Sequence, residues 1–527
     1  MLIYIPPSSH VNFKIQNLSI YSPKFNNSKM AWLWIWILII ISLLIPLSLL
    51  KINDKKLPPG PKGFPIFGSF HLLGKLPHRD LHTLSQKYGP IMHIKLGIIP
   101  TIIVSSPNAA ELFLRTYDHV FASRPQTYAS NYLFYGQKNF GFSKYGSYWR
   151  NMRKMCTHEL LSNQKVSMFE PIRRNQVGLL VENLKEAART QVAVNLSSKV
   201  LCVVRDMTCL MVFGKKYVED QEMIMDEKSF HDAVKEVVQL VATPNLSDFI
   251  PCVAWFDFQG INRRAKSLRN MFDGFLERII EEHLDDQFKN ENKNQDFVDV
   301  LLGLMGSQNN EYNIDPSTIK ALILMVITAM DTTATNIDWA IVELIRHPHI
   351  MKKMQQELDK VVGLQRMVLE SDLEHLQYLN MVIKEVLRLH PPVPLLVPHE
   401  SLQDCTTNGF HIPKQSRIIV NAWAIGRDPT VWNDPQKFFP ERFIDSEVDL
   451  KGKDFELIPF GSGRRCCPGM HLGLTMVRLL LAQLVHAFYW ELPNGILPNQ
   501  LDMTEEFGLT CPRAQHLMVT PIYRLIL

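Results

Sequence analysis

Residues 459–469 read PFGSGRRCCPG, and this loop decides how the rest of the chain is interpreted. Its glycines allow a tight bend and a close approach to a flat ligand. The residues from Met470 to Phe488 are helical in character, so Cys467 lies just before the N-terminus of a helix. The unpaired N–H groups and the dipole at that end favour a thiolate over a thiol. Arg465 adds positive charge nearby, or grips a carboxylate. The pattern therefore predicts a thiolate ligand at Cys467.

A glycine-rich loop before a helix also suits phosphate binding, but neither phosphate-binding motif is present. The pattern G-x-G-x-x-G fails because Cys466 stands where the third glycine belongs, and no Gly-Lys-Ser/Thr follows. The chain has eight cysteines and no C-x-x-C pair, so structural zinc sites and c-type haem attachment lack their usual signature. The scattered cysteines are typical of free thiols in a reducing compartment.

The loop resembles the haem-binding loop of the cytochrome P-450 family, F-x-x-G-x-R-x-C-x-G. The matching residues are Phe460, Gly463, Arg465, Cys467 and Gly469. Further matches follow the order of the family: Trp149 and Arg153 for W-x-x-x-R, Glu385 and Arg388 for E-x-x-R, and residues 438–443 for the P-E-R-F stretch. The hinge LPPGP at 57–61 and the stretch NLSDF at 245–249 resemble the plant microsomal A-type branch.

The resemblance covers residue 57 to the end and implies a single haem-thiolate domain. It implies a mainly α fold with small β-sheets, and haem b whose iron is bound by Cys467. Strand-like runs are indeed short, at 91–96 and 101–105. Trp149, Arg153, His399 and Arg465 are candidates for contacts with the haem propionates. Glu385 and Arg388 share one helix face, and Arg442 is expected to complete a structural network with them.

A long helix is expected between an N-cap at Asp315 and His347, which precedes Pro348. Its middle is almost wholly apolar, which predicts burial, yet Asp331 and Thr332 interrupt the apolar run. A buried carboxylate is costly unless it has a task or a partner. The resemblance implies that this acid–alcohol pair handles protons and oxygen. The chain departs from the family at Ala329, where glycine is common, and the added methyl narrows the oxygen groove.

The family resemblance implies a monooxygenase that inserts one atom of O2 into a small lipophilic substrate. A plant specialised metabolite, such as a phenylpropanoid, terpenoid or alkaloid, is expected. No nicotinamide or flavin motif occurs, so electrons are expected from an NADPH-dependent diflavin reductase that docks on Arg150, Lys154 and Arg464. The alternatives are a haem-thiolate isomerase or dehydratase that uses no O2, and a haem-binding protein without catalysis. The Asp331–Thr332 pair disfavours both.

Four segments are expected to line the substrate pocket. They are the loop before Trp149, the long helix near Met325 and Ala329, residues 393–397 and residues 508–510. The apolar stretch 249–256 is expected to dip into a bilayer where substrate enters. The formal net charge of +4 is nearly balanced. Nucleic-acid binding would need a clustered basic stripe, so no nucleic-acid partner is expected.

The N-terminal part contains one strong membrane signal. Residues 31–50 read AWLWIWILIIISLLIPLSLL without a charge, and about 20 apolar residues span a bilayer core. Lysines follow at 51, 55 and 56, which favours a cytosolic catalytic domain. A cleaved signal peptide is the alternative, but the run is long and no small-residue cleavage site follows.

The expected organisation of the chain therefore has four parts. Residues 1–29 form an N-terminal extension without an assigned role, residues 31–50 a transmembrane anchor, residues 51–74 a proline-rich hinge and entry segment, and residues 75–527 the catalytic domain. The expected location is the endoplasmic reticulum membrane, with a single pass and lipid contact.

Overall fold

The computed structural model describes residues 56–526, except 217–226, 288–294, 307–311 and 313, together with Trp32, Ile35 and Trp36. The chain divides into two compact units, Met1–Asp54 and Lys55–Leu527. The predicted anchor at 31–50 lies outside the described residues, apart from those three, which are helical and exposed. The second unit holds almost all of the described residues.

Most of the described part of this unit is helical. Its longer helices are α2 Pro77–Tyr88, α6 Ser147–Met155, α8 Glu170–Thr190, α9 Leu196–Phe213, α10 Glu227–Ala242, α12 Ile261–Gln287, α13 Phe297–Gly306, α14 Pro316–Arg346, α15 Pro348–Val361, α16 Gln377–Leu389 and α18 Met470–Ala487. Short helices are α3 Pro107–Glu111, α4 Asp118–Phe121, α5 Tyr128–Leu133, α7 Asn163–Met168, α11 Leu246–Phe249 and α17 Ala422–Ile425.

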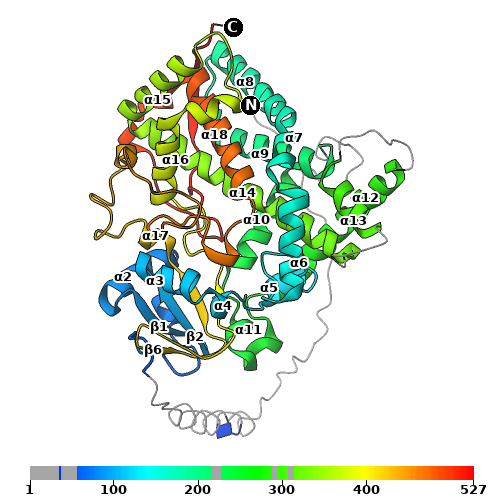
Figure 1. The fold of residues 1–527 in the computed structure, drawn as a ribbon, viewed down its shortest axis with the longest axis vertical. Coiled ribbons are helices and arrows are strands. Elements are labelled where there is room, and N and C mark those ends of the chain that lie inside the picture. The colour runs from blue at the N-terminus through cyan, green and yellow to red at the C-terminus, as the bar shows by residue number, and fades with distance from the viewer. Residues whose placement is uncertain are drawn as a thin grey trace, which may run out of the picture. The chain divides into compact units, whose positions relative to one another are not determined.

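Among the described residues, three small sheets accompany the helices, and the prediction of a mainly helical fold is confirmed. The largest has the order β1-β2-β7-β4, formed by Ile91–Leu96, Ile99–Val104, Arg417–Val420 and His399–Glu400. The second joins β3 Val194–Asn195, β9 Met518–Tyr523 and β8 Phe488–Glu491, and the third pairs β5 Cys405–Thr407 with β6 Phe410–Ile412. In Figure 1 the β1–β2 hairpin lies beside α2 and α3, away from α14, α16 and α18.

Helix α14 runs through the helical part, as the sequence predicts (Figure 1). The Asp315 carboxylate accepts a hydrogen bond from the backbone N–H of Thr318 at 2.7 Å, and Pro316 occupies the first turn. The helix ends at Arg346, one residue before His347 and two before Pro348. It packs against α9, α16 and α18, so its apolar middle is buried on several sides. The candidate site residues of α14, Asp331 and Thr332, therefore lie on a helix that crosses the core.

The proline-rich segment after residue 56 is docked on the large sheet. The carbonyl of Pro59 accepts a hydrogen bond from the N–H of His93 on β1 at 2.9 Å. A Cβ at Gly60 would lie 1.7 Å from the His93 carbonyl oxygen, so only glycine fits this approach. The compact unit starts at Lys55, so the part of the predicted hinge that is described belongs to the folded body.

Among the described residues, two helices are long and apolar enough to cross a membrane, Pro316–Arg346 and Met470–Ala487. Both are mostly buried inside the unit, as core helices of a large domain are. They provide weak support for a membrane-spanning role.

Candidate active site

The loop 459–469 folds back on itself before α18. The backbone N–H of Cys467 donates to the carbonyl of Phe460 at 2.9 Å. Gly463 has a φ of +64°, and a Cβ there would lie 2.1 Å from the carbonyl oxygen of Leu114. Glycine is thus required at this position both by conformation and by space. This local folding places Cys467 three residues before the first residue of α18.

The structure distinguishes Cys467 from its neighbour. Both cysteines are partly buried, but only Cys467 lines the large cavity of the domain. Burial raises the pKa of the Cys467 thiol to about 11, although a hydrogen bond from the Gly469 N–H opposes the rise. Without a bound metal ion, desolvation therefore outweighs the effect of the helix end on the pKa of this thiol. A metal ion bound at the sulfur would reverse the balance, since a coordinating thiol is deprotonated.

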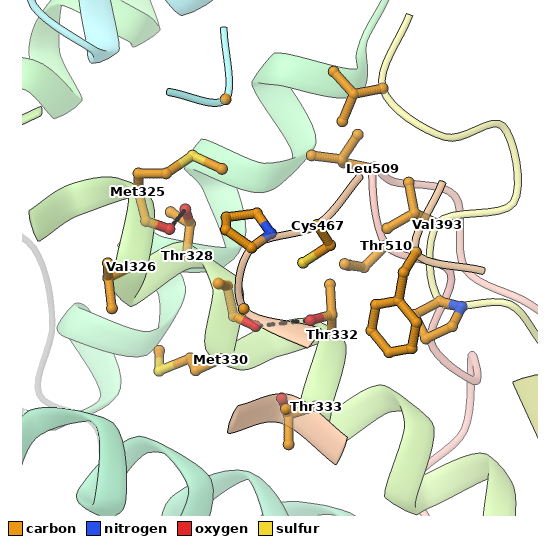
Figure 2. Close-up of a pocket in the computed structure, with 18 of the residues that line it drawn as sticks. Met325, Val326, Thr328, Met330, Thr332, Thr333, Val393, Cys467, Leu509 and Thr510 are labelled. Atoms are coloured by element: carbon orange, nitrogen blue, oxygen red, sulfur yellow. Dashed lines mark hydrogen bonds between the residues drawn. The ribbon is translucent and has the colours of Figure 1, made fainter. Parts of the chain in front are cut away.

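The cavity beside Cys467 has a volume of about 320 Å³ and mostly apolar walls (Figure 2). Every segment that the sequence nominated contributes to it: the loop before Trp149, α14, residues 393–397 and residues 508–510. Representative lining residues are Phe142, Met325, Ala329, Val393, Leu509 and Thr510. Such a cavity suits a small lipophilic molecule.

The cavity is also lined by helices that the sequence analysis did not name as pocket walls, among them α9, α10 and α18. Helix α9 supplies Thr208, Met211 and Val212, and α10 supplies Val237, Val238 and Val241. The spacing of these residues follows one helix face, but an apolar face packed on a core gives the same pattern. The helical spacing of apolar residues therefore could not distinguish a cavity wall from an ordinary core-facing surface.

Four basic side chains also line the cavity: Arg124, Arg153, His399 and Arg465. Arg465 donates to the carbonyls of Ala122 at 2.7 Å and Ser143 at 2.6 Å. Arg124 donates to the carbonyl of Pro398 at 2.9 Å. The sequence nominated three of the four. Arg124 was missed because no local motif marks it.

The charges of this basic cluster are not compensated inside the cavity. Burial, and then the guanidinium groups of Arg465 and Arg153, hold the pKa of Arg124 well below its usual range. Burial and Arg153 lower the pKa of Arg465 to about 9. Burial and Arg124 lower the pKa of His399. No Asp or Glu among the described residues lines the cavity.

This donor set fits haem b. Buried cations without carboxylate partners match the two propionates, because burying a charge is costly unless it is paired. The thiol of Cys467 in the same cavity matches the iron. Trp149 does not line the cavity. Its Nε1–H donates to the Phe140 carbonyl at 3.0 Å, and its ring lies 4.4 Å from the Arg465 guanidinium, so it positions Arg465. Phe460 and Gly469 line the cavity, whereas Gly463 shapes the loop.

Glu385 and Arg388 of α16 form one buried network with Arg442, which lies in the segment before the loop of Cys467. Arg388 donates to both carboxylate oxygens of Glu385 at 2.8 Å, and Arg442 donates to Oε1 at 3.0 Å. Arg388 also donates to the carbonyls of Gly426 and Pro435. The network therefore ties α16 to the segment 426–442 that precedes the loop of Cys467.

Asp331 and Thr332 have different surroundings in the structure. Thr332 lines the cavity, and its hydroxyl donates to the Ala329 carbonyl at 2.8 Å (Figure 2). Asp331 does not line it. Its carboxylate instead accepts a hydrogen bond from Thr510, and burial raises its pKa.

Comparisons with known proteins identify the family to which the chain is similar. The family model "Cytochrome P450" matches residues 58–518. A cytochrome P450 of Panax ginseng is 50% identical over 477 residues, which cover 89% of this chain and 94% of that protein. A flavonoid 3′-monooxygenase of Arabidopsis thaliana is 42% identical over 481 residues, covering 90% and 93%. A zebrafish cytochrome P450 solved with abiraterone has a TM-score of 0.71 at 26% identity, covering 85% of this chain and 100% of the other.

Proposed function

The chain belongs to the cytochrome P450 family of haem-thiolate enzymes, and from this premise we propose that Cys467 binds the haem iron of a monooxygenase that acts on a small lipophilic substrate. One observation carries the assignment of the cysteine: Cys467 shares a cavity with three arginines and no carboxylate of the described residues. Cys466 and the other cysteines of this part of the chain do not line that cavity.

When bound, haem b supplies the iron chemistry that activates dioxygen, which no side chain provides. Cys467 would hold the iron, and Arg124, Arg153, His399 and Arg465 would hold the propionates. The apolar walls exclude bulk water and orient the substrate. Thr332 presents its hydroxyl oxygen to the cavity, and burial raises the pKa of Asp331, the preceding residue. The Glu385–Arg388–Arg442 network has a structural role behind the loop.

The substrate is proposed to be a plant specialised metabolite, such as a phenylpropanoid, terpenoid or alkaloid. The mostly apolar walls support a lipophilic molecule, and one relative is named as a flavonoid 3′-monooxygenase. Screening a panel of flavonoids, terpenes and alkaloids for substrate-induced shifts of the haem spectrum would narrow the class. A panel that gives shifts only with polar, charged compounds would contradict the proposal.

Membrane attachment at the endoplasmic reticulum through residues 31–50 is part of the proposal, with a cytosolic catalytic domain. The folded body offers its own support. Trp255, Phe256 and Phe258 are 92%, 68% and 71% exposed, an unusual density of exposed apolar side chains. Phe249 and Ile250 are buried, so the lipid-facing part of the predicted stretch starts after them.

A second apolar group joins this exposed segment. Phe64, Phe67 and Ile98 are 60%, 56% and 57% exposed. Hydrogen bonds connect them to α11, because the N–H of Ile98 donates to the Phe249 carbonyl at 3.0 Å and the N–H of Gly97 donates to the Phe67 carbonyl at 3.2 Å. The two groups therefore offer one apolar surface for lipid.

An NADPH-dependent diflavin reductase is proposed to dock on the cations beside the loop of Cys467. Arg150 and Arg464 lie 5.8 and 5.9 Å from the same Tyr145 ring, and Lys154 is one turn further along α6. Arg464 also pairs with Asp118 at 2.9 Å.

The decisive experiment for the function measures turnover of the best panel compound with and without NADPH and reductase. Product that forms only when NADPH, reductase and oxygen are all present supports a monooxygenase. Product without NADPH and oxygen would indicate a haem-thiolate isomerase or dehydratase instead. A protein that binds haem but converts no compound of the panel would favour a non-catalytic role.

A further inference from the structure

The carboxylate of Asp331 has an unexpected partner. Asp331 and Thr332 are neighbours in sequence, but the Thr332 hydroxyl is bonded to the Ala329 carbonyl. The hydroxyl of Thr510, 179 residues further along the chain, donates to Asp331 Oδ2. Among the hydrogen bonds of the described residues, this contact is the one that joins Asp331 to a side chain of the cavity wall.

Thr510 lies between Asp331 and the cavity. It belongs to the segment between residue 500 and β9, is 3% exposed, and lines the cavity together with Thr332 and Cys467 (Figure 2). A threonine hydroxyl donates one hydrogen and accepts on its lone pairs. It can therefore take a proton from one side and release its own proton on the other.

On the solvent side, Asp331 faces three titratable groups from two segments. His231 and Lys235 are four residues apart on α10 and share a face, and Glu506 belongs to the same C-terminal segment as Thr510. Their charges act on Asp331. Lys235 and Glu506 form an ion pair at 3.0 Å with side chains that are 42% and 36% exposed. The half-exposed Lys235–Glu506 pair thus places charged groups that reach the surface close enough to act on Asp331.

We propose that Thr510 is the side chain through which Asp331 delivers a proton to the cavity. When Asp331 is protonated this hydrogen bond reverses: the Asp331 O–H donates to Thr510 Oγ1, and the Thr510 hydroxyl turns its own hydrogen toward the cavity. The O–H bond of Asp331 then breaks as Thr510 Oγ1 gains that proton. The original hydroxyl proton of Thr510 passes to an oxygen acceptor in the cavity. Asp331 is left as a carboxylate and regains a proton from solvent past His231 and Lys235. One proton crosses and no electron moves. Burial raises the pKa of this carboxyl, which favours its protonated form relative to an exposed Asp.

The inference rests on the proposed function, and its test combines two readouts. The variants are Thr510→Val, which removes the hydroxyl and keeps the volume, and Thr510→Ser, which keeps the hydroxyl. The matched control is Thr328→Val, because Thr328 also lines the cavity but donates to the Met325 carbonyl at 3.0 Å. The first readout is product per NADPH consumed with the reductase and 7-ethoxycoumarin as marker substrate.

For this first readout, Thr510→Val should lower the yield per NADPH about tenfold, less than the full contribution of a positioned proton donor because water can replace part of the route. Thr510→Ser should stay within about twofold of the parent. Thr328→Val measures how far the loss of any hydroxyl from the cavity wall lowers the yield per NADPH, and the loss in Thr510→Val should be clearly larger. Equal losses in Thr510→Val and Thr510→Ser would show that packing, not the hydroxyl, matters, and would overturn the proposal.

The second readout follows the Asp331 carboxyl band by infrared spectroscopy against pH, assigned with Asp331→Asn. The hydrogen bond from Thr510 lowers the pKa of Asp331, so Thr510→Val should raise it, and Thr328→Val should leave it unchanged. An unshifted pKa, or a shifted pKa with a normal yield per NADPH, would overturn the relay. If the parent protein forms no product from any substrate, the proposed function fails, while this titration still tests the Asp331–Thr510 contact.

Discussion

The carboxylate of Glu385 accepts hydrogen bonds from two guanidinium nitrogens of Arg388 at 2.8 Å, and neither side chain has any exposed surface. Removing Arg388 leaves Arg442 as the remaining charged partner of the buried Glu385 carboxylate and breaks the hydrogen bonds of Arg388 to the carbonyls of Gly426 and Pro435. Arg388→Leu should therefore destabilise the protein by about 3–5 kcal/mol, measured by chemical or thermal unfolding. The matched control is Arg189→Gln, which breaks an exposed pair with Glu186 on α8 and should have no measurable effect. Equal stability of the two variants would contradict the structural role of the Glu385–Arg388–Arg442 network.

A pH dependence is expected from Asp248 on α11. Its carboxylate accepts the N–H of Tyr128 at 2.8 Å, and burial raises its pKa to about 6. Between the ordinary pKa of Asp and pH 6 the folded protein keeps a proton that the unfolded chain has lost. Stability conferred through this group therefore falls as the pH rises through that window. Asp248→Asn should gain about 2–3 kcal/mol above pH 7 and little at pH 4, measured as the difference in unfolding free energy from the parent. A constant difference across pH would contradict the assignment.

Haem retention should depend on Arg124, which no motif marked. Arg124 is 5% exposed and lies in the cavity with Arg153 and Arg465. Loss of a charged hydrogen bond to a propionate costs about 1.5–3 kcal/mol, so Arg124→Gln should speed haem loss about 10- to 100-fold. Transfer of haem to apomyoglobin measures this rate. Arg124→Lys should recover part of the loss, and Arg150→Gln, an exposed change on α6, should leave it unchanged. If Arg124→Gln lost haem as slowly as the parent protein, Arg124 would not be a propionate ligand.

Docking of the reductase should depend on Arg150. Charge reversal in Arg150→Glu should raise the KM for reductase about 3- to 10-fold at low salt, since rim charges act mainly on association. The difference should shrink as salt is added. Arg189→Glu carries the same charge change on α8 and serves as control. Equal effects of both variants would show a general charge effect rather than a docking surface.

Local patterns were enough for part of the fold and site. The cap at Asp315 and the break at Pro348 define α14 because both act within one helical turn. The motif spacing counted from Gly463 selects Cys467 rather than Cys466. Gly463 is a reliable reference point because its left-handed conformation and its close approach to Leu114 require glycine.

Long-range packing explains what the sequence did not predict. Arg124 joins the basic cluster through contacts with residues near 398, and Asp331 meets Thr510 rather than Thr332. Neither contact has a local signature. The rise in the pKa of the free Cys467 thiol has a related reason, because helix-end effects are local whereas desolvation depends on the whole fold.

The central claim is that Cys467, and not Cys466, binds the haem iron. The most direct measurement is the spectrum of the reduced, carbon-monoxide-bound protein for Cys467→Ala and Cys466→Ala, with circular dichroism to establish that both are folded. We predict that Cys466→Ala keeps the long-wavelength band of a thiolate-ligated haem and that Cys467→Ala loses it. Loss of the band in Cys466→Ala with its retention in Cys467→Ala would contradict the assignment.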